Sequence, residues 1–338
     1  DKVAVLGILE AVETLLADGF TPARTICLAF GHDEEIDGLA GAAAIVKHFE
    51  DAGTRFEFVL DEGMLIVEGI IPGLDPAAAL IGLSEKGFAN VTLTVRSTGG
   101  HSSIPPSETA VGILSNAIAR LEATPMEPRL DGPTREMFRW VAPEMSFGMR
   151  LVMGNLWLTG PLVRSQLAAA PATNAAIRTT AAPTMLQGSP KANVLAGEAS
   201  AVINYRILPG DTPDDVLEHV RTVIDDDRVS VELGPGTPSV PSPVSSVDSA
   251  AFDTIAASVR AVFPEVVVAP SLVIPATDAR YYARVADDAY RLLPIVVTSE
   301  DLDRFHGVNE RIAVDGYTRG IVFYADLMRR AAGGTHGR

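Results

Sequence analysis

The sequence predicts an α/β protein in which a domain built on a mostly parallel sheet is interrupted by a smaller α+β domain. Residues 24–60 follow the order strand, helix, strand, which is typical of parallel sheets. Residues 88–97 instead alternate between apolar and polar side chains, as a half-exposed antiparallel strand does. Beyond a linker rich in Pro, Gly and Ser at 234–246, the alternation of helices and strands returns.

We assign residues 1–86 and 237–338 to the first domain. Hydrophobic periodicity predicts its elements in this order: a helix at 3–18, a buried strand at 24–30, a helix at 39–53, a strand at 55–60, a helix at 249–263, strands near 271–276 and 291–297, and a closing helix at 313–331. Cys27 lies in the run expected to be a buried strand, so we expect a structural thiol rather than a nucleophile.

The second domain is assigned residues 87–236. Its expected elements are a strand at 88–97, a helix at 109–123, a strand at 198–208, a helix at 212–224 and a strand at 228–234. Thr212 is the expected N-cap of the fourth element. An apolar insertion near 126–170 is rich in Pro, Met and aromatic residues. Helices on one face of an antiparallel sheet would give a small α+β sandwich.

Composition limits the classes of function. The chain has 338 residues, of which 47% are hydrophobic and 21% charged, as in globular proteins with a sizeable core. Its formal charge of −16 argues against nucleic acid or an anionic membrane as the main partner. The strongest apolar stretch, 56–83, is interrupted by acidic residues, so no membrane span is predicted. A single cysteine excludes a disulfide framework within the chain.

Ionisable side chains follow three of the predicted strands. The cluster at 32–35 follows the first strand, Asp61 and Glu62 follow the second, and His306 lies in the loop after the strand near 291–297. If these strands are neighbours, the side chains meet in one crevice, where a divalent cation such as zinc would relieve the repulsion between carboxylates. Solvated loops, a helix cap and a surface histidine explain the same residues, and periodicity leaves both interpretations open.

Six motifs occur in one order along the chain: HDEEIDGLAGA, FVLDEG, STGGHSSIPP, PKANVLAGEASAVINYRILPGDT, ATDARYY and FHGVNERI. In these motifs the chain resembles the di-zinc metallopeptidases that include carboxypeptidase S, aminoacylase and the N-fatty-acyl-amino-acid hydrolases, the Gly-X carboxypeptidase-like group. The resemblance spans nearly the whole chain. It implies a zinc-exopeptidase-like catalytic domain, a lid domain through which two copies form a homodimer, and two zinc ions in the intact protein.

The resemblance also implies roles for individual residues. Glu34 is expected to be the general base, and Glu35 and His306 to be ligands of one zinc. Asp61 is expected to bind the second zinc. The implied reaction is metal-assisted hydrolysis, in which zinc lowers the pKa of a water, Glu34 takes its proton, and the hydroxide attacks an amide carbonyl.

Four further residues match positions that contact the substrate in the family. His101, in GGHSS, resembles the lid histidine that stabilises the oxyanion in the partner subunit. Arg280 resembles the residue that binds the free carboxylate of the substrate, a role that suits a guanidinium. Asn193 and Arg206 match lid-side substrate contacts less specifically. A turn histidine, a surface arginine at a helix start and an arginine paired with a neighbouring acid are the plain alternatives for His101, Arg280 and Arg206.

The chain departs from the family pattern at its beginning. Relatives carry an upstream His-x-Asp motif and a bridging Asp two positions before a Lys, and Asp1–Lys2 begins just after that Asp would stand. We therefore expect an N-terminally truncated chain whose first strands are missing. Zinc in hydrolases has three protein ligands, so this chain alone is not expected to hold two zinc ions or to turn over substrate. The compartment stays open.

The leading hypothesis is hydrolysis of the amide bond of N-acyl amino acids or short peptides with a free carboxylate. Alternatives are a dipeptidase or an N-carbamoyl-amino-acid hydrolase on the same scaffold, and an inactive homologue that serves as a dimerising or binding module. The apolar segment 137–158 either lines a lane for an acyl chain or, as the simpler interpretation has it, packs the core of the lid.

Overall fold

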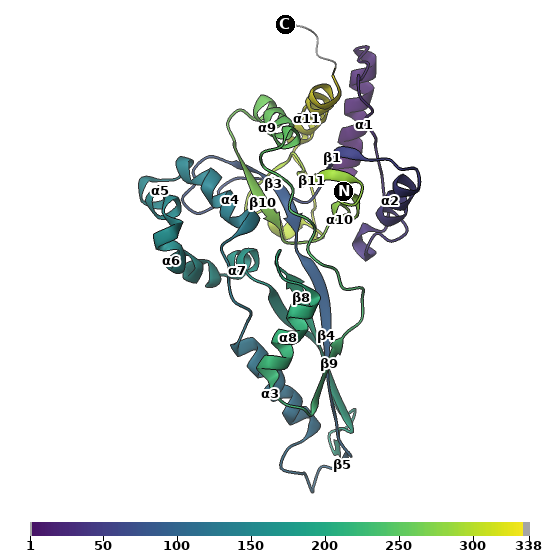
Figure 1. Ribbon diagram of the computed structural model, residues 1–338, viewed down its shortest axis with the longest axis vertical. Helices are drawn as coiled ribbons and strands as arrows, with labels where there is room; N and C mark the ends of the chain where they lie inside the picture. The colour runs from purple at the N-terminus through teal and green to yellow at the C-terminus, as the bar shows by residue number, and fades with distance from the viewer. Residues whose placement is uncertain (1, 334–338) are drawn as a thin grey trace. The chain divides into compact units, whose positions relative to one another are not determined.

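The computed structural model describes residues 2–333 and divides them into two units (Figure 1). Unit 1 contains the described residues up to Glu85, Asp131–Val163 and those from Pro243 onward. Unit 2 contains Lys86–Leu130 and Arg164–Ser242. The boundaries lie within a few residues of those expected from the sequence, except that the segment Asp131–Val163 belongs to unit 1.

Unit 1 is built on a six-stranded sheet with the order β1-β11-β3-β2-β12, in which β10 also pairs with β3. The strands are β1 (Phe56–Asp61), β2 (Ile66–Val67), β3 (Ala78–Glu85), β10 (Val267–Val273), β11 (Ala286–Arg291) and β12 (Val296–Val297). The pairs β1–β11, β3–β10 and β2–β12 are parallel, whereas β3 pairs with β11 and β2 only briefly and antiparallel. The predicted α/β class with mostly parallel pairing is confirmed.

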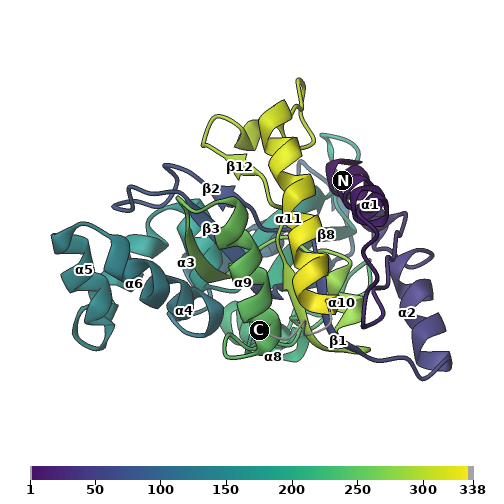
Figure 2. The same cartoon turned by 90° about the horizontal axis from the view of Figure 1, so that it is seen from above.

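Helices surround this sheet, and their bounds are α1 (Lys2–Ala17), α2 (Ala42–Asp51), α4 (Gly132–Val141), α5 (Phe147–Gly154), α6 (Leu156–Ala168, which continues into unit 2), α9 (Ala250–Val262), α10 (Ala279–Tyr282) and α11 (Val314–Ala332). Helix α11 packs between α1 and α9 (Figure 2). The core beneath them includes the fully buried rings of Phe252, Phe263 and Phe323. No helix in the described part of the chain has the length and apolar character needed to cross a bilayer.

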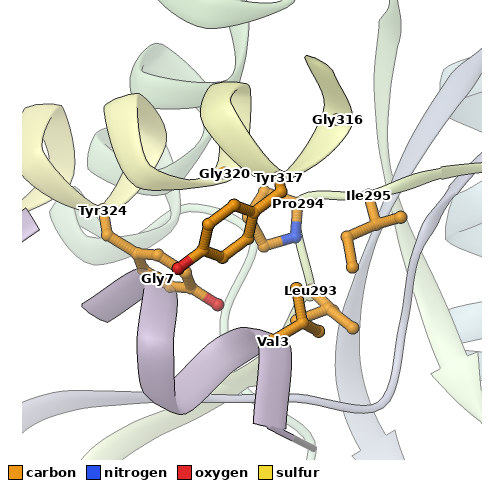
Figure 3. Close-up of a pocket in the computed structure, with 9 residues that line it drawn as sticks. All are labelled: Val3, Gly7, Leu293, Pro294, Ile295, Gly316, Tyr317, Gly320 and Tyr324. Atoms are coloured by element: carbon orange, nitrogen blue, oxygen red, sulfur yellow. The ribbon is translucent and has the colours of Figure 1, made fainter. Parts of the chain in front are cut away.

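Gly7 lies where α1 packs against α11. A Cβ atom at this position would stand 3.4 Å from Cε2 of Tyr324. Figure 3 shows the small pocket beside this contact, which is lined by apolar side chains, glycines and tyrosine rings. Because it contains no carboxylate, imidazole or basic side chain, it belongs to the packing of the helices and not to the chemistry discussed below.

Unit 2 is an antiparallel sheet with the order β6-β8-β4-β9 and a separate two-stranded ribbon, β5–β7. Its elements are β4 (Gly87–Arg96), β5 (Gly100–His101), α3 (Ala110–Ala123), α7 (Pro171–Ile177), β6 (Thr180–Gln187), β7 (Val194–Leu195), β8 (Glu198–Ile207), α8 (Pro213–Ile224) and β9 (Val229–Leu233). Alternate residues of β4 and β8 are buried, and they form one core with α3 and α8. This alternation confirms the half-exposed antiparallel strands expected from the sequence.

Thr212 caps α8 as predicted. Its Oγ1 accepts from the backbone N–H of Asp215 at 3.2 Å, while the Asp215 carboxylate accepts from the Thr212 N–H at 2.8 Å. These two bonds satisfy donors that the first helical turn would otherwise leave unpaired.

We expect Thr212→Ala to lower the free energy of unfolding of unit 2 by about 0.5–2 kcal/mol, because it removes this cap. The measurement is urea unfolding followed by circular dichroism. Thr222→Ala, at an exposed position inside the same helix, is the matched control and should be neutral or slightly stabilising. Equal losses from both variants would contradict the capping role.

The strand predicted at 24–30 is wrong. The segment has no regular secondary structure, and all but one of its residues, Ile26, are exposed. A strand needs a neighbour to satisfy its backbone groups, and no strand within residues 2–333 pairs with this segment. The expected buried thiol is wrong for the same reason, because Cys27 is exposed.

The insertion is also placed differently from the expectation. Helix α4 packs on β10 and β3 of unit 1, and its Trp140 ring meets Phe252 edge-on, with 5.5 Å between ring centroids. The simpler interpretation, that the segment packs the core of the second domain, is therefore wrong. The amphipathic pattern of α4, with Phe138 and Val141 buried, accounts for its place as an extra layer on the first sheet.

Candidate active site

Acidic side chains from three separate segments of unit 1 gather around the end of β1. Glu34 and Glu35 form a single 3₁₀ turn, Glu34–Ile36. Asp61 ends β1 and Glu62 follows it, while Asp278 directly precedes α10. Glu34, Glu62 and Asp278 all lie close enough to Asp61 for its charge to raise their pKa values.

The backbone of the 33–38 loop is shaped by its polar residues. Asp33 and Asp37 both adopt the left-handed conformation, with φ of 61° and 80°. The Asp33 carboxylate accepts from the Ala40 N–H at 2.9 Å, which closes the loop around the 3₁₀ turn. Gly38 is required where it stands, because a Cβ atom there would lie 2.5 Å from Oδ1 of Asp278.

Burial, reinforced by the shared negative charge, raises the pKa values of Glu34, Glu62 and Asp278. Burial raises the pKa of Glu34, with Glu35 and Asp61 adding to the effect and Arg280 opposing it. Burial, and then the charge of Asp61, raise the pKa of Glu62 to about 7. The same two causes raise the pKa of Asp278 to about 7. Raised carboxyl pKa values are typical of sites that hold a proton or a cation.

Asp61 offers an oxygen without a partner. Its Oδ1 accepts from the N–H of Glu62 at 2.9 Å. Its Oδ2 is buried and accepts no hydrogen bond from the described residues, and burial raises the pKa of this carboxyl. Since a buried acceptor without a donor is costly, this oxygen suits a cation or a bound water.

Glu35 and His306 come together across unit 1. Nδ1 of His306 lies 3.5 Å from Oε1 of Glu35, although the two residues are far apart in the sequence. Both side chains are more than 70% exposed, so the pair contributes little to stability. Strands β1 and β12 lie at opposite ends of the strand order. His306 reaches Glu35 from the loop after β12, where its backbone has a φ of 56°.

The donors fit zinc in kind but do not complete a site. Carboxylate oxygens and an imidazole nitrogen are the ligands expected. However, within residues 2–333 no three His, Cys, Asp or Glu side chains stand close enough together to hold a metal ion. The described residues thus offer the Glu35–His306 pair and, separately, the buried Oδ2 of Asp61.

Arg280 is the cation of the cluster. Its Nη2 donates to the carbonyl oxygen of Asp37 at 3.0 Å, and the Tyr281 hydroxyl donates to the same oxygen at 2.6 Å. The guanidinium lies 4.9 Å from the centroid of the Tyr281 ring. Its Nε is buried and has no hydrogen-bond partner among the described residues. A buried guanidinium N–H without a partner suits the carboxylate of a ligand.

A buried ion pair, which was not expected from the sequence, contacts residues next to this cluster. Glu85 and Arg291 are 1% and 0% exposed, and Nε of Arg291 donates to Oε1 of Glu85 at 2.8 Å. The N–H and the hydroxyl of Thr277 each donate to the Glu85 carboxylate at 2.8 Å. Arg291 is also the register partner of Asp61. The pair therefore anchors the residue before Asp278 and the end of β1.

Three of the matched residues, His101, Asn193 and Arg206, lie in unit 2. His101 ends β5 and Asn193 directly precedes β7, the partner strand, and the N–H of Ser102 donates to the Asn193 carbonyl at 3.2 Å. Nδ1 of His101 accepts from the N–H of Ser103 at 3.3 Å, so the neutral ring carries its proton on Nε2. Arg206 lies near the C-terminal end of β8, and its Cζ stands 5.3 Å from the centroid of the Phe88 ring.

Asp278 is a site residue that no prediction named, and Glu62 was expected among the acidic residues at the strand ends but was given no role. Both residues lie inside motifs, ATDARYY and FVLDEG. Their positions near Arg280 and next to Asp61 were the signal in the sequence that could have indicated a role. Glu85 carried no such signal, because its partner Arg291 is 206 residues away in the chain.

Comparison with known proteins points in one direction. The profile of peptidase family M20/M25/M40 matches residues 1–330. The N-fatty-acyl-amino acid synthase/hydrolase PM20D1.1 of Danio rerio is 42% identical over 333 residues, covering 98% of this chain and 64% of the relative. The probable carboxypeptidase S-like 2 of Dictyostelium discoideum is 41% identical over 332 residues, covering 97% and 63%. The chain thus spans slightly less than two thirds of these relatives.

Solved structures share the fold at low identity. The metallo-carboxypeptidase Sso-CP2 of Sulfolobus solfataricus, described as an M20 family member, matches with a TM-score of 0.63 and 17% identity, covering 97% of this chain and 75% of that one. The di-peptidase Dug1p of Saccharomyces cerevisiae matches with a TM-score of 0.62 and 11% identity, covering 99% and 72%.

Proposed function

Because the chain belongs to peptidase family M20/M25/M40, we propose that the intact protein is a zinc-dependent hydrolase of N-acyl amino acids or short peptides with a free C-terminal carboxylate. The observation that carries the proposal is the position of Glu34. Burial raises the pKa of this half-buried carboxyl. The charges of Glu35 and Asp61 raise the pKa further, and the charge of Arg280 lowers it. The proposal thereby combines a base, metal-binding groups and a carboxylate-binding group in unit 1.

Each residue has a distinct task. Glu35 and His306 contribute ligands to one zinc, and Asp61 contributes a ligand to a second. Zinc, when bound, lowers the pKa of water and polarises the amide carbonyl. Glu34 accepts the proton of the attacking water and delivers it to the leaving amine. The guanidinium of Arg280 holds the substrate carboxylate and so orients the amide toward Glu34.

Three further residues of the proposal lie in unit 2. The proton on Nε2 of His101 suits a donor to the developing oxyanion, and Asn193 directly precedes β7, the strand that pairs with β5. Arg206 is a second candidate for contact with the substrate. The proposal includes a homodimer formed through unit 2, and its support is the resemblance of the GGHSS motif to lid histidines that act in the partner subunit.

The test is substrate selectivity at Arg280. Removing a charge-assisted contact of about 1.5–3 kcal/mol should lower kcat/KM about 10- to 100-fold. We expect this loss in Arg280→Ala for an N-acyl amino acid with a free carboxylate, and little change for the same substrate blocked as its amide. Arg280→Lys should recover only part of the activity, because lysine cannot form the bidentate contact.

The matched control is Arg284→Ala, which removes an exposed arginine that pairs with Glu50 near the same helix. It should leave both activities unchanged. Equal losses for the acid and the amide in Arg280→Ala would contradict the assigned role of Arg280. Absence of amide hydrolysis by the zinc-supplied intact protein, on both acyl amino acids and peptides, would overturn the proposed function itself.

A further inference from the structure

Helices α5 and α6 present large apolar side chains to solvent. Phe147 and Trp157 are 75% and 80% exposed, and Leu158 is 66% exposed. Leu151 and Leu162 are more than half exposed, and each follows an exposed apolar residue at a spacing of four, so both helices carry an apolar stripe. These five residues, all in unit 1, are called the α5–α6 patch below; Figure 1 shows the two helices next to each other.

The exposed residues are not the whole of either helix. Met153 of α5 and Val163 of α6 are buried. The turn between them is also ordered by hydrogen bonds, since the Asn155 side chain donates to the Leu151 carbonyl at 2.8 Å. Each helix thus has buried residues as well as an exposed stripe. Soluble proteins seldom expose such a group of large apolar residues unless it binds something.

The charged residues of the segment 145–197, which contains α5 and α6, are all basic, opposite in sign to the net charge of the whole chain. No Asp or Glu occurs between Glu144 and Glu198, although the chain holds 43 acidic residues and a net charge of −16. Arg150 and Arg164 are the only charged residues in α5 and α6. Arg150 is exposed in α5, and its Nη2 donates to the Met145 carbonyl at 3.3 Å. Because salt screens charges beyond about 8 Å, a contacting surface senses this local positive charge.

We propose that the α5–α6 patch docks on lipid surfaces that carry anionic headgroups. Phe, Leu and Trp would enter the boundary between headgroups and acyl chains, and Arg150 would pair with phosphate. The acidic remainder of the chain would be repelled by the same surface, so that docking is restricted to this patch. The proposal does not depend on the proposed hydrolase activity.

The test uses the chain's two tryptophans, Trp140 and Trp157. We expect co-sedimentation with vesicles of phosphatidylcholine and phosphatidylglycerol in equal parts, and much less with phosphatidylcholine alone. Tryptophan emission should shift to shorter wavelength on binding. The shift should persist in Trp140→Phe and disappear in Trp157→Phe, because Trp140 packs against Phe252 within unit 1.

Two variants test the contributions of the patch. Phe147→Ser with Leu158→Ser should weaken vesicle binding at least tenfold, because burying each such side chain is worth roughly a tenfold or larger factor. Arg150→Glu should abolish the preference for phosphatidylglycerol. Leu16→Ser, an equally exposed leucine of α1, is the matched control and should bind as the unchanged chain does. Thermal unfolding of every variant checks that the fold is retained.

Three results would overturn the proposal. The first is absence of vesicle binding by the unchanged chain. The second is binding that the patch variants do not weaken. The third is self-association through the patch, seen as a mass in sedimentation equilibrium that falls in the Phe147→Ser, Leu158→Ser variant, with no binding to vesicles; a second copy of the chain would then be the partner.

Discussion

Arg291→Ala should destabilise unit 1 by about 3–5 kcal/mol, one of the largest effects expected from a single substitution in this chain. The substitution leaves the carboxylate of Glu85, which is 1% exposed, buried without its cation. It also removes the bond from Nη1 of Arg291 to the Ala289 carbonyl, 2.6 Å long. Urea unfolding measures the loss, fitted for unit 1 separately because two units need not unfold together.

The control for this variant is Arg55→Ala. Arg55 pairs with Asp287 at 2.7 Å, but both side chains are exposed, so the expected cost is below about 1 kcal/mol. Replacing both partners, as in Glu85→Leu with Arg291→Met, should recover much of the stability because no unpaired charge stays buried. A loss from Arg291→Ala no larger than that from Arg55→Ala would show that the buried pair is not needed.

Glu34→Gln should lower kcat of the zinc-supplied intact protein about 10²- to 10⁴-fold, the usual contribution of a general base. Glutamine has nearly the same shape as glutamate but cannot accept the proton of water. Substrate binding should change little, since Arg280 and the zinc ligands are untouched. The measurement is steady-state hydrolysis of an N-acyl amino acid, together with the zinc content of the purified variant.

Glu35→Gln, at the adjacent position, is the comparison variant for Glu34→Gln. Glu35 is paired with His306, so its substitution should lower the zinc content, whereas Glu34→Gln should leave it unchanged. The two adjacent glutamates are thereby separated by their effects. Retained activity in Glu34→Gln would contradict its assignment as the base, and zinc loss in Glu34→Gln alone would exchange the two roles.

Side-chain periodicity and capping residues predicted the helices and strands whose formation depends on neighbouring residues in the sequence. The period of apolar residues was enough for α1, α8 and α11, and Thr212 followed from the preference of caps for hydroxyl side chains. Strand β4 followed from its alternation. In contrast β3, with all eight residues buried, shows no alternation, so periodicity could not detect it within the apolar stretch that contains it.

The candidate site was predictable in part for a related reason. Glu34, Glu35, Asp61, Arg280 and His306 lie in motifs that can be matched along the chain. Their roles stay predictions until the variants above are measured. What the motifs could not indicate is the support beneath them, because the Glu85–Arg291 pair joins the ends of β3 and β11 and exists only once these strands are neighbours.

The sequence by itself determined the α/β class, the second, antiparallel unit and the motifs of peptidase family M20/M25/M40. These depend on side-chain period and on short stretches of sequence. Tertiary structure alone decided that residues 24–30 form no strand, that Asp131–Val163 joins unit 1, and that Glu35 meets His306. The physical reason is the same in each case: a backbone partner, a surface to cover or a distant side chain is supplied by residues far away in the chain.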